Sequence, residues 1–504
     1  MSIIKLPRTT PEEQGVSSYR LQKFLNRLKE INIELHTFMI LRNGSVIAEA
    51  YRQPYSPEYR RLLHSLSKSF TSTAIGIAID EGILAIDDKV ALFFPNELPE
   101  KQDEKLLEMT VFNLLTMTTG HKEDTLGALI SSGERTWIEA FLACPLDYKP
   151  GTQFVYNSGA TFMLSAIIQK ITGLTLFEYL QPRVFEPLGI QGAQWDQSPC
   201  GVNTGGWGLM VKPEDIAKFG QMYLQEGVFS GKRIVSKKWV QQASSKSVSN
   251  DTGVNPDIEW NQGYGFQFWM CRHDAYRADG AFGQYCVVMP KQNMVFVATC
   301  EENCTQNLLD ILWEELIADT TNQALLSNCN DFCELQQKLD GFEKIKNISS
   351  RHSYLEKIIH NRSFISKELM SGIHEIKFHF ERNRLTVHIE GEGTQKFESS
   401  CTDWVYGEMD NIIVPPVFIQ WFQLQNEKTL YACQHTWLND NILEITLKYL
   451  ESAHQYKIIC VFENGNIHIT FVPSYAKYLL SAPDSMGLLK NEFTFNGVMS
   501  NSVL

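Results

Sequence analysis

The chain has 504 residues, of which 43% are hydrophobic and 20% are charged, and its formal net charge is −13. This length is large for one core and favours two domains, and the composition is that of a folded globular protein. Because the excess negative charge repels nucleic-acid phosphates and anionic lipids, we expect neither nucleic acid nor a membrane as a partner.

The N-terminal segment and the cysteines predict a cytoplasmic protein. Residues 1–20 contain no apolar stretch of the kind found in signal peptides, and no apolar run is long enough to cross a bilayer. The 11 cysteines are odd in number and scattered, unlike a disulfide framework. The pairs Cys300/Cys304 and Cys329/Cys333 are spaced more loosely than the C-x-x-C of zinc sites, so no metal and no cofactor are expected.

The first expected elements are a hairpin and a helix. Residues 37–51 form two short apolar runs around Asn43-Gly44, which is a strong signal for a β-hairpin. The segment from Ser65 to about Asp80 carries apolar residues at helical spacing. From about residue 105 to 250 the pattern is mainly that of helices and loops.

Strand character returns late in this part of the chain. Residues 284–290 and 294–300 are rich in β-forming residues and are separated by a short polar turn, and 305–319 has the pattern of a helix. β-Structure therefore encloses a helical middle within residues 1–320. This order predicts one domain with a mostly antiparallel sheet, formed by the first and last segments, and an inserted helical subdomain.

The remaining residues differ in character. Residues 321–371 are polar, with a helical pattern but no strong apolar face, and we interpret them as a connecting region. Alternation dominates after them, and 376–391 and 456–473 are predicted hairpins. We expect residues 372–504 to form a second, β-rich domain, whose role the sequence leaves open.

The main chemical motif is Ser65-Leu66-Ser67-Lys68, at the start of the predicted helix. Residues three apart share a helix face, so the Ser65 hydroxyl and the Lys68 amine can meet. A serine becomes a nucleophile when a neighbour removes its proton, and a lysine can do this if burial lowers its pKa. A capping serine followed by a solvated lysine gives the same pattern, so the assignment depends on further motifs.

Three later segments supply that context. HSLSKSFTSTAIG at residues 64–76 is followed in order by LLTMTTGH at 114–121, PGTQFVYNSGA at 150–160 and GAFGQY at 280–285. Together they resemble the serine β-lactamases and penicillin-binding-protein-like hydrolases, in particular the class C-like branch with its esterases and D-aminopeptidases, over roughly residues 10–320. The resemblance implies a β-lactamase/transpeptidase-like α/β (α+β) fold: a three-layer sandwich with an antiparallel sheet and an all-helical subdomain.

The resemblance also implies roles for the motif residues. The first motif makes Ser65 the nucleophile and Lys68 its proton partner. The second places Tyr156 where a phenol exchanges protons with the nucleophile and the leaving group; without the family match, Tyr156 is equally well an aromatic residue at a helix entry. Ser158 stands where many relatives have asparagine, so its expected hydrogen bonding to substrate would use a smaller hydroxyl group.

The third family motif departs from its usual form. Lys-Thr-Gly or His-x-Gly in relatives is Ala278-Asp279-Gly280 here, so the usual cation is missing. Gly280 permits close backbone approach, and the N–H groups of Ala281 and Ser65 are expected to form the oxyanion hole.

Four further residues are candidates for the surroundings of the site. Strand alternation directs Arg277 to the face opposite the site. Gly283, in the same motif as Gly280, is included in the expected substrate-binding set. His121 either borders the cleft or is a structural hydrogen-bonding residue. Trp207 either walls the pocket or packs beside a glycine turn.

These residues predict a serine hydrolase that cleaves an ester or an amide through an acyl-serine intermediate, on a small-molecule or short-peptide substrate. Esterase, amidase and D-amino-acid peptidase activities are all open. Ala278 predicts weak or no β-lactamase activity, with Tyr276 and Phe282 offering an apolar surface to neutral substrates instead. Two alternatives remain: a catalytically silent binding or scaffold protein with this fold, and a C-terminal ligand-binding module with an accessory hydrolase domain. Neither the substrate nor the oligomeric state can be predicted.

Overall fold

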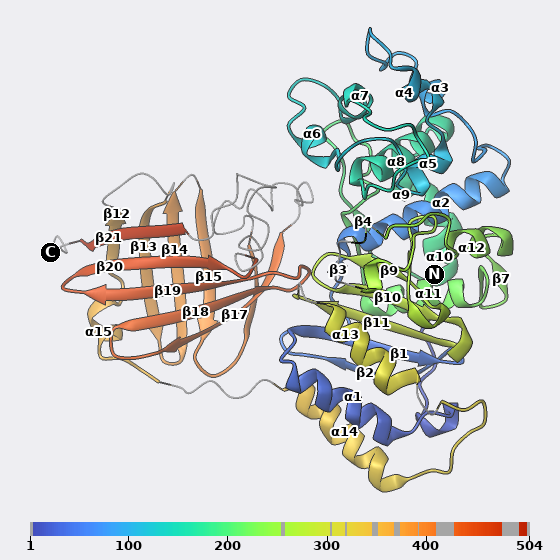
Figure 1. Cartoon of the computed structure of the whole chain (residues 1–504). Coiled ribbons are helices and arrows are strands. Elements are labelled where there is room, and N and C mark those ends of the chain that lie inside the picture. The colour runs from blue at the N-terminus through green and yellow to red at the C-terminus, as the bar shows by residue number, and fades with distance from the viewer. Residues whose placement is uncertain are drawn as a thin grey trace. The chain divides into compact units, whose positions relative to one another are not determined.

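Figure 1 shows a computed structural model of the chain. It describes residues 4–251, 253, 258–302, 305–317, 320–344, 351–366, 373–391, 393–409, 428–475 and 493–500. The chain divides into two compact units, Met1–Lys344 and Ile345–Leu504. The stretch 321–371, which we interpreted as a connecting region, is therefore shared between the two units rather than lying outside both.

The first unit is built on a six-stranded antiparallel sheet in the order β2-β1-β11-β10-β9-β8. The predicted hairpin pairs β1 with β2, and β1 also pairs with β11 from the end of the unit, so the first and last segments share one sheet as predicted. All eight residues of β1 are buried, as befits a strand covered on both faces. The strands are β1 (Leu35–Arg42), β2 (Ser45–Tyr51), β8 (Trp269–Met270), β9 (Tyr276–Gly280), β10 (Gln284–Met289) and β11 (Met294–Cys300).

Helices cover both faces of this sheet (Figure 1). The helices α1 (Ser18–Glu30), α13 (Gln306–Leu312) and α14 (Cys329–Glu343) share one apolar cluster with the sheet, including Phe24, Phe38 and Leu335. The helices α2 (Ser67–Asp80) and α11 (Pro213–Leu224) share a second cluster, including Phe70, Phe219 and Val295. The result is the predicted three-layer sandwich.

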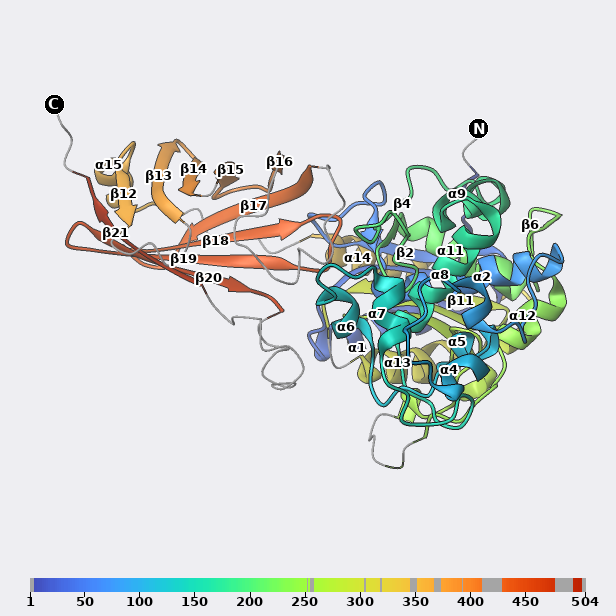
Figure 2. The same ribbon diagram turned by 90° about the horizontal axis from the view of Figure 1, so that it is seen from above.

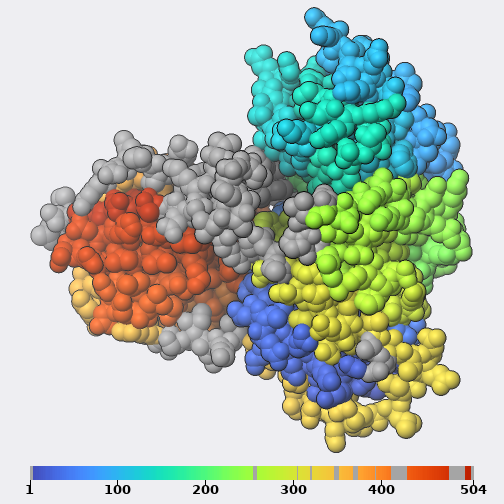
Figure 3. All heavy atoms as spheres, in the orientation of Figure 1, coloured from blue at the N-terminus to red at the C-terminus, as the bar shows by residue number. Residues whose placement is uncertain are grey.

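A helical subdomain is inserted after α2, and in Figure 3 its residues form one continuous lobe of the first unit. Its helices are α3 (Val90–Phe93), α4 (Glu104–Glu108), α5 (Val111–Leu115), α6 (Leu126–Ile130), α7 (Trp137–Ala143), α8 (Ser158–Thr172) and α9 (Leu176–Leu180). Among the described residues no single helix has the length and apolarity to span a membrane, and only the bent pair Ser158–Thr172 and Leu176–Leu188 passes that test jointly.

Short elements complete the first unit. The strands β3 (Arg61–Leu62), β5 (Leu209–Val211) and β4 (Gln194–Trp195) form a small sheet in that order, which connects the turn before α2 to the loop that follows the helical subdomain. The others are η1 (Glu12–Gln14), η2 (His64–Leu66), η3 (Gln181–Phe185), α10 (Glu186–Leu188), β6 (Val228–Phe229), β7 (Lys232–Arg233), α12 (Lys237–Ala243), η4 (Ile258–Trp260), η5 (Arg272–Asp274), η6 (Pro290–Gln292) and η7 (Trp313–Ile317).

The second unit is a ten-stranded sheet in the order β15-β14-β13-β12-β21-β20-β19-β18-β17-β16, and an additional pairing of β15 with β17 closes it on itself. Figure 2 shows β12–β16 and β17–β21 as two facing layers. Both predicted hairpins are present, as β13/β14 and β19/β20. The elements are α15 (Leu355–Ile359), β12 (Ser363–Ser366), β13 (Ile373–Glu381), β14 (Arg384–Gly391), β15 (Thr394–Ser400), β16 (Val405–Met409), β17 (Thr429–Trp437), β18 (Ile442–Tyr449), β19 (Gln455–Glu463), β20 (Asn466–Pro473) and β21 (Phe493–Met499).

Strand alternation explains the interior of this sheet. Along β19 and β20 every second residue is buried, as it is along β13 from Ile376 onward, and those residues form one apolar cluster that includes Phe378, Leu447 and Phe471. The cavity among them measures about 10 Å³. The β-rich character predicted for this part of the chain is confirmed.

Candidate active site

Ser65 lies on the short turn η2, which follows β3 and runs directly into α2. The chain passes from strand to helix here through His64, whose φ of +48° is unusual for a residue with a side chain. His64 and Leu66 are buried, whereas Ser65 is only partly buried. The turn therefore presents the Ser65 hydroxyl at the edge of the core.

Lys68 lies one helical turn beyond Ser65 and is 1% exposed. Its Nζ donates to the Ser65 Oγ at 3.1 Å, to the Ser158 Oγ at 3.2 Å and to the Gly206 carbonyl at 2.8 Å. Burial lowers the pKa of Lys68 to about 8, although the charge of Asp124 opposes the shift. The three acceptors are neutral oxygens, so they compensate the ammonium less than a carboxylate would.

Tyr156 covers the other side of the amine. The Lys68 Nζ lies 4.9 Å from the centre of its ring, which stacks on Trp269 at 5.5 Å. Burial raises the pKa of Tyr156 well above the usual range of a phenol, a hydrogen bond with Ser65 opposes this shift, and the charges of Asp279 and Asp124 add to it. The Tyr156 side chain is therefore a protonated phenol in contact with Ser65.

The start of α8 holds Ser158 beside Lys68. Asn157 is the N-cap, and its Oδ1 accepts from the backbone N–H of Ala160 at 3.2 Å. The backbone N–H of Ser158 donates to the Asp124 carboxylate at 2.8 Å. Ser158 is 6% exposed, and its hydroxyl accepts from Lys68, so it contacts the predicted proton partner.

His121 lies behind this helix start. It is 2% exposed, and its Nδ1 lies 2.9 Å from the Thr119 hydroxyl and 3.4 Å from the Asn157 Nδ2. Burial lowers the pKa of His121 to about 4, opposed by the charge of Asp147. Of its two predicted interpretations, the structure favours the hydrogen-bonding residue over one that borders the cleft.

The loop before β5 supplies a hydrogen-bond acceptor for Lys68 and a packed tryptophan. A Cβ on Gly206 would lie 3.0 Å from the Ser158 carbonyl and 3.4 Å from the Lys68 Nζ, so the absence of a side chain lets its carbonyl reach the amine. Trp207 follows, 5% exposed, with its ring 5.8 Å from Trp137. Trp207 is thus packed beside the glycine turn and offers little surface to a substrate.

The end of β9 approaches the turn that carries Ser65. A Cβ on Gly280 would lie 2.1 Å from the Leu63 carbonyl oxygen, so only glycine permits this approach. Ala281 comes next and is exposed, beside the same turn. Gly283, in contrast, is buried with its Cα facing Cys300 and Thr305, which makes it a packing residue.

Ala278 and Arg277, also on β9, do not supply the cation of the family motif. Ala278 is 1% exposed and belongs to the apolar core. Arg277, directed away as predicted, is fully buried, with its Nε 2.8 Å from the Asp279 carboxylate and its guanidinium 4.3 Å from the Trp260 ring centre. Position 278 therefore brings no cation to the site, and Arg277 does not replace it.

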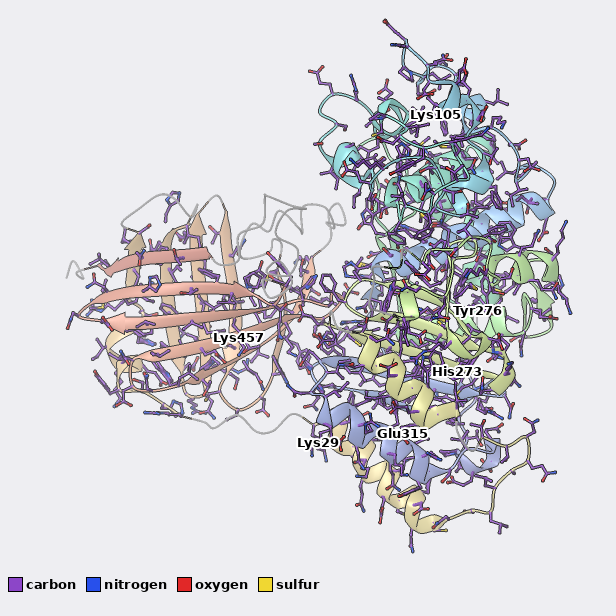
Figure 4. The ribbon with its side chains drawn as sticks, in the orientation of Figure 1. Lys29, Lys105, His273, Tyr276, Glu315 and Lys457 are labelled. Carbon is purple, nitrogen blue, oxygen red and sulfur yellow. The ribbon has the colours of Figure 1, made fainter. Side chains whose placement is uncertain are left out.

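The prediction that Tyr276 offers surface to a substrate is wrong. Tyr276, labelled in Figure 4, is 4% exposed and packs against Phe268 at 5.8 Å and Tyr223 at 6.5 Å. It shares the buried face of β9 with Ala278, because residues two apart along a strand face the same side. Phe282 is half-buried, and its ring lies 5.3 Å from that of His64.

The cysteines show no metal-binding arrangement in the described part of the chain. Cys300 is buried in β11, Cys329 and Cys333 are exposed on α14, and Cys304 lies outside the described residues. No group of three or more His, Cys, Asp or Glu side chains among the described residues is placed to hold a metal ion.

Three residues at the site were not predicted. Asp124 binds the start of α8, the Gly206 carbonyl binds Lys68, and Trp269 stacks on Tyr156. Asp124 has a sequence signal, because Asp-Thr directly before an apolar stretch is typical of a helix start. Gly206 binds Lys68 through its backbone carbonyl, and Trp269 lies on a strand far from Tyr156 in the sequence. Neither role can therefore be recognised from the sequence around the residue.

Comparisons with known proteins agree with this geometry. The family model described as Beta-lactamase matches residues 30–308, more than half of the chain. The 6-aminohexanoate-dimer hydrolase of Paenarthrobacter ureafaciens is 28% identical over 317 residues, which cover 57% of this chain and 78% of that protein. The lovastatin esterase of Penicillium rubens is 27% identical over 167 residues, covering 29% of this chain and 41% of the esterase.

Among solved structures, the octameric penicillin-binding protein homologue from Pyrococcus abyssi covers 89% of this chain and 97% of its own, at 16% identity and a TM-score of 0.47. That likeness is too weak to add to the assignment, which depends on the family match and on the hydrolase relatives. The chain therefore belongs to the beta-lactamase family and is a serine hydrolase of that family.

Proposed function

We propose that the chain hydrolyses amide or ester bonds through an acyl-serine intermediate on Ser65, with Lys68 as the base and Tyr156 as a proton donor. One observation carries the proposal: the buried Lys68 Nζ lies 3.1 Å from the Ser65 Oγ. This distance is within the reach needed for direct proton transfer between nucleophile and base. A catalytically silent relative would have no need of a buried amine held against this hydroxyl.

The protonation states support this division of roles. With a pKa of about 8, Lys68 is neutral in about a tenth of the molecules at pH 7, and the neutral amine can accept the Ser65 proton. Tyr156, whose pKa is raised by burial, keeps its proton and can donate it. The lysine is therefore the better acceptor and the phenol the better donor.

The reaction follows from these positions. As the Ser65 Oγ bonds to the substrate carbonyl carbon, its proton passes to the Lys68 Nζ, and the carbonyl oxygen becomes an oxyanion. We assign the oxyanion to the backbone N–H groups of Ser65 and Ala281, which the close approach of Gly280 to Leu63 brings near each other. The leaving group departs with a proton from Tyr156, which Lys68 then restores. A water molecule releases the acid by the same steps in reverse order.

The names of the relatives support both bond types. One is a hydrolase of the 6-aminohexanoate dimer, an amide, and another is an esterase of lovastatin. Their identities to this chain are below 30%, so the acyl group and the leaving group of its own substrate are not transferred from them. Small neutral esters and amides are the proposed class, because Ala278 brings no cation to the site.

Labelling with a fluorophosphonate, followed by mass mapping of the adduct, tests the proposal. We expect one adduct, on Ser65, and none in the Ser65→Ala protein. Ser67→Ala is the matched control: Ser67 is fully buried, its hydroxyl donates to the His64 carbonyl, and its loss should leave Ser65 labelled. An adduct elsewhere, or equal labelling of Ser65→Ala, would show that Ser65 is not the nucleophile.

The interior of the second unit does not favour the alternative of a ligand-binding module, whereas a hollow of about 250 Å³ elsewhere in this unit is lined by polar residues: Asn361, Glu375, Lys377, His379, His388 and Glu390. Its interior is apolar, and the cavity of about 10 Å³ holds at most one water molecule. Ligand sites for small molecules have volumes of about 300–1,000 Å³. The hydrolase function is assigned to the first unit, which holds Ser65, Lys68 and Tyr156.

A further inference from the structure

We propose that Asp124 is a positioning residue of the active site, which fixes Ser158 against Lys68 and keeps a negative charge close to the amine. The inference rests on the proposed function, since it concerns the same base. It adds a residue outside the family motifs, which binds the backbone of Ser158 rather than Ser65 itself.

The geometry begins with the carboxylate itself. Asp124 lies on the loop between α5 and α6, and its Oδ1 accepts the backbone N–H of Leu126 at 3.0 Å and that of Ser158 at 2.8 Å. The Ser158 hydroxyl in turn accepts from the Lys68 Nζ at 3.2 Å. One residue thus separates the carboxylate from the amine, and it is bonded to both.

Thr125, the next residue, also binds the start of α8. The backbone N–H of Thr125 donates to the Asn157 Oδ1 at 3.2 Å, and its hydroxyl donates to the same oxygen at 2.8 Å. Asp124 and Thr125 therefore hold two successive residues of α8, Asn157 and Ser158. The first residues of this helix cannot shift relative to the loop without breaking three hydrogen bonds.

Asp124 is the carboxylate whose charge acts on the amine. The start of α8 presents Tyr156 and Ser158 to Lys68, and the loop before β5 presents the Gly206 carbonyl. The turn η2 contributes His64. Strand β9 contributes Asp279, whose carboxylate faces Arg277 at 2.8 Å and acts on Tyr156.

The charge has a defined direction of effect. Burial lowers the pKa of Lys68 to about 8 and the charge of Asp124 raises it, so the amine is protonated in most molecules at neutral pH. A substitution that removes the charge of Asp124 but keeps its hydrogen-bond acceptor should therefore lower the pKa of Lys68 further. The neutral amine, and with it the activity, should then persist to lower pH.

The test is the pH dependence of kcat/KM on a nitrophenyl ester in the full chain. Asp124→Asn keeps an oxygen acceptor and removes the charge, so the acidic limb should move down by roughly 0.5–1 pH unit, with the plateau at high pH within about threefold of the parent protein. Asp124→Glu keeps the charge and should leave the limb in place. Asp124→Ala loses the acceptor as well, and its plateau should fall by about tenfold.

The matched control is Glu123→Gln, which removes the same charge from the exposed neighbouring residue and should not move the limb. An Asp124→Asn limb that superimposes on that of the parent protein overturns the proposal, as does an equal shift in Glu123→Gln. If instead Ser65 is not labelled by the fluorophosphonate, the proposed function itself fails, so the two failures are distinguishable.

Discussion

Two buried lysines of the first unit lie in opposite chemical surroundings. Lys68 is 1% exposed and contacts three neutral oxygens, whereas Lys218 on α11 is 3% exposed and donates to the Asp215 carboxylate at 2.9 Å. Burial raises the pKa of the Asp215 carboxyl, and the charge of Lys218 opposes that shift. The two buried lysines therefore differ in their partners: Lys68 donates to neutral oxygens, whereas Lys218 donates to a carboxylate.

The largest expected effect is on kcat, which should fall on substitution of Lys68 but not on substitution of Lys218. Lys68→Ala removes the base and should lower kcat by about 10²–10⁴-fold, the usual range for loss of proton transfer. Lys218→Ala removes a buried amine of the same kind elsewhere and should leave kcat within about threefold. Steady-state rates on a nitrophenyl ester, with circular dichroism to establish folding, provide the comparison. Near-normal turnover in folded Lys68→Ala protein would show that another group serves Ser65.

The free energy of unfolding should fall more on substitution of Lys218 than on substitution of Lys68, the reverse of the order expected for kcat. Lys218→Ala leaves the Asp215 carboxylate buried without its counter-ion, which typically costs about 3–5 kcal/mol of the free energy of unfolding. Urea denaturation measures it. The double variant Lys218→Met/Asp215→Leu removes both charges and should recover most of the loss. A single variant as stable as the parent would mean that this ion pair does not hold α11 in place.

The lowered pKa of Lys68 should also make the free energy of unfolding depend on pH. The pKa of Lys68 is about 8 in the folded protein and about 10.5 in the unfolded chain, so the unfolded chain binds more protons between these values. The parent protein should therefore gain stability relative to Lys68→Met as pH rises from about 8 to 10.5, by up to about 3 kcal/mol, and show a constant difference below pH 7. Parallel denaturation series at several pH values measure the difference, and a flat difference would contradict the lowered pKa.

The smallest expected effect concerns substrate choice. β-Lactam antibiotics carry a carboxylate, and a charge-assisted hydrogen bond to it is worth about 1.5–3 kcal/mol, or roughly ten- to a hundredfold in binding. Because Ala278 is buried in the core and Arg277 faces Asp279, no cation from β9 supplies that bond. Short-chain nitrophenyl esters should therefore be hydrolysed at least about tenfold faster than a chromogenic cephalosporin. Faster cephalosporin hydrolysis would reveal another cation at the site.

Local spacing explains why part of the site could be predicted. Ser65 and Lys68 are three residues apart on one helix, so their contact follows from helical geometry. The Gly206 carbonyl reaches the same amine from a loop far away in the chain, and Asp124 reaches the Ser158 backbone from another loop, and no local rule places either of them there. Tyr276 could have been placed correctly, because strand alternation puts it on the buried face with Ala278.

The fold was predictable where the apolar pattern is dense. Strand β1 is fully buried and strand β13 alternates over most of its length, and each of these patterns is typical of a strand. Helix α14 lacked such a signal, because Leu335 and Leu339 are its only buried residues, so the segment that contains it was interpreted as a connection. Its packing on α1 depends on a few side chains that composition alone does not distinguish.

Helix α2 has a consequence for how the protein loses activity. All residues from Ser67 to Ala78 are buried, so the helix that follows the nucleophile has no exposed face from which it could fray. We therefore expect the amide hydrogens between Ser67 and Ala78 to exchange slowly with solvent. Heat inactivation and loss of tertiary structure should therefore occur as one event, and a proteolytic fragment without the surrounding layers cannot retain an assembled site.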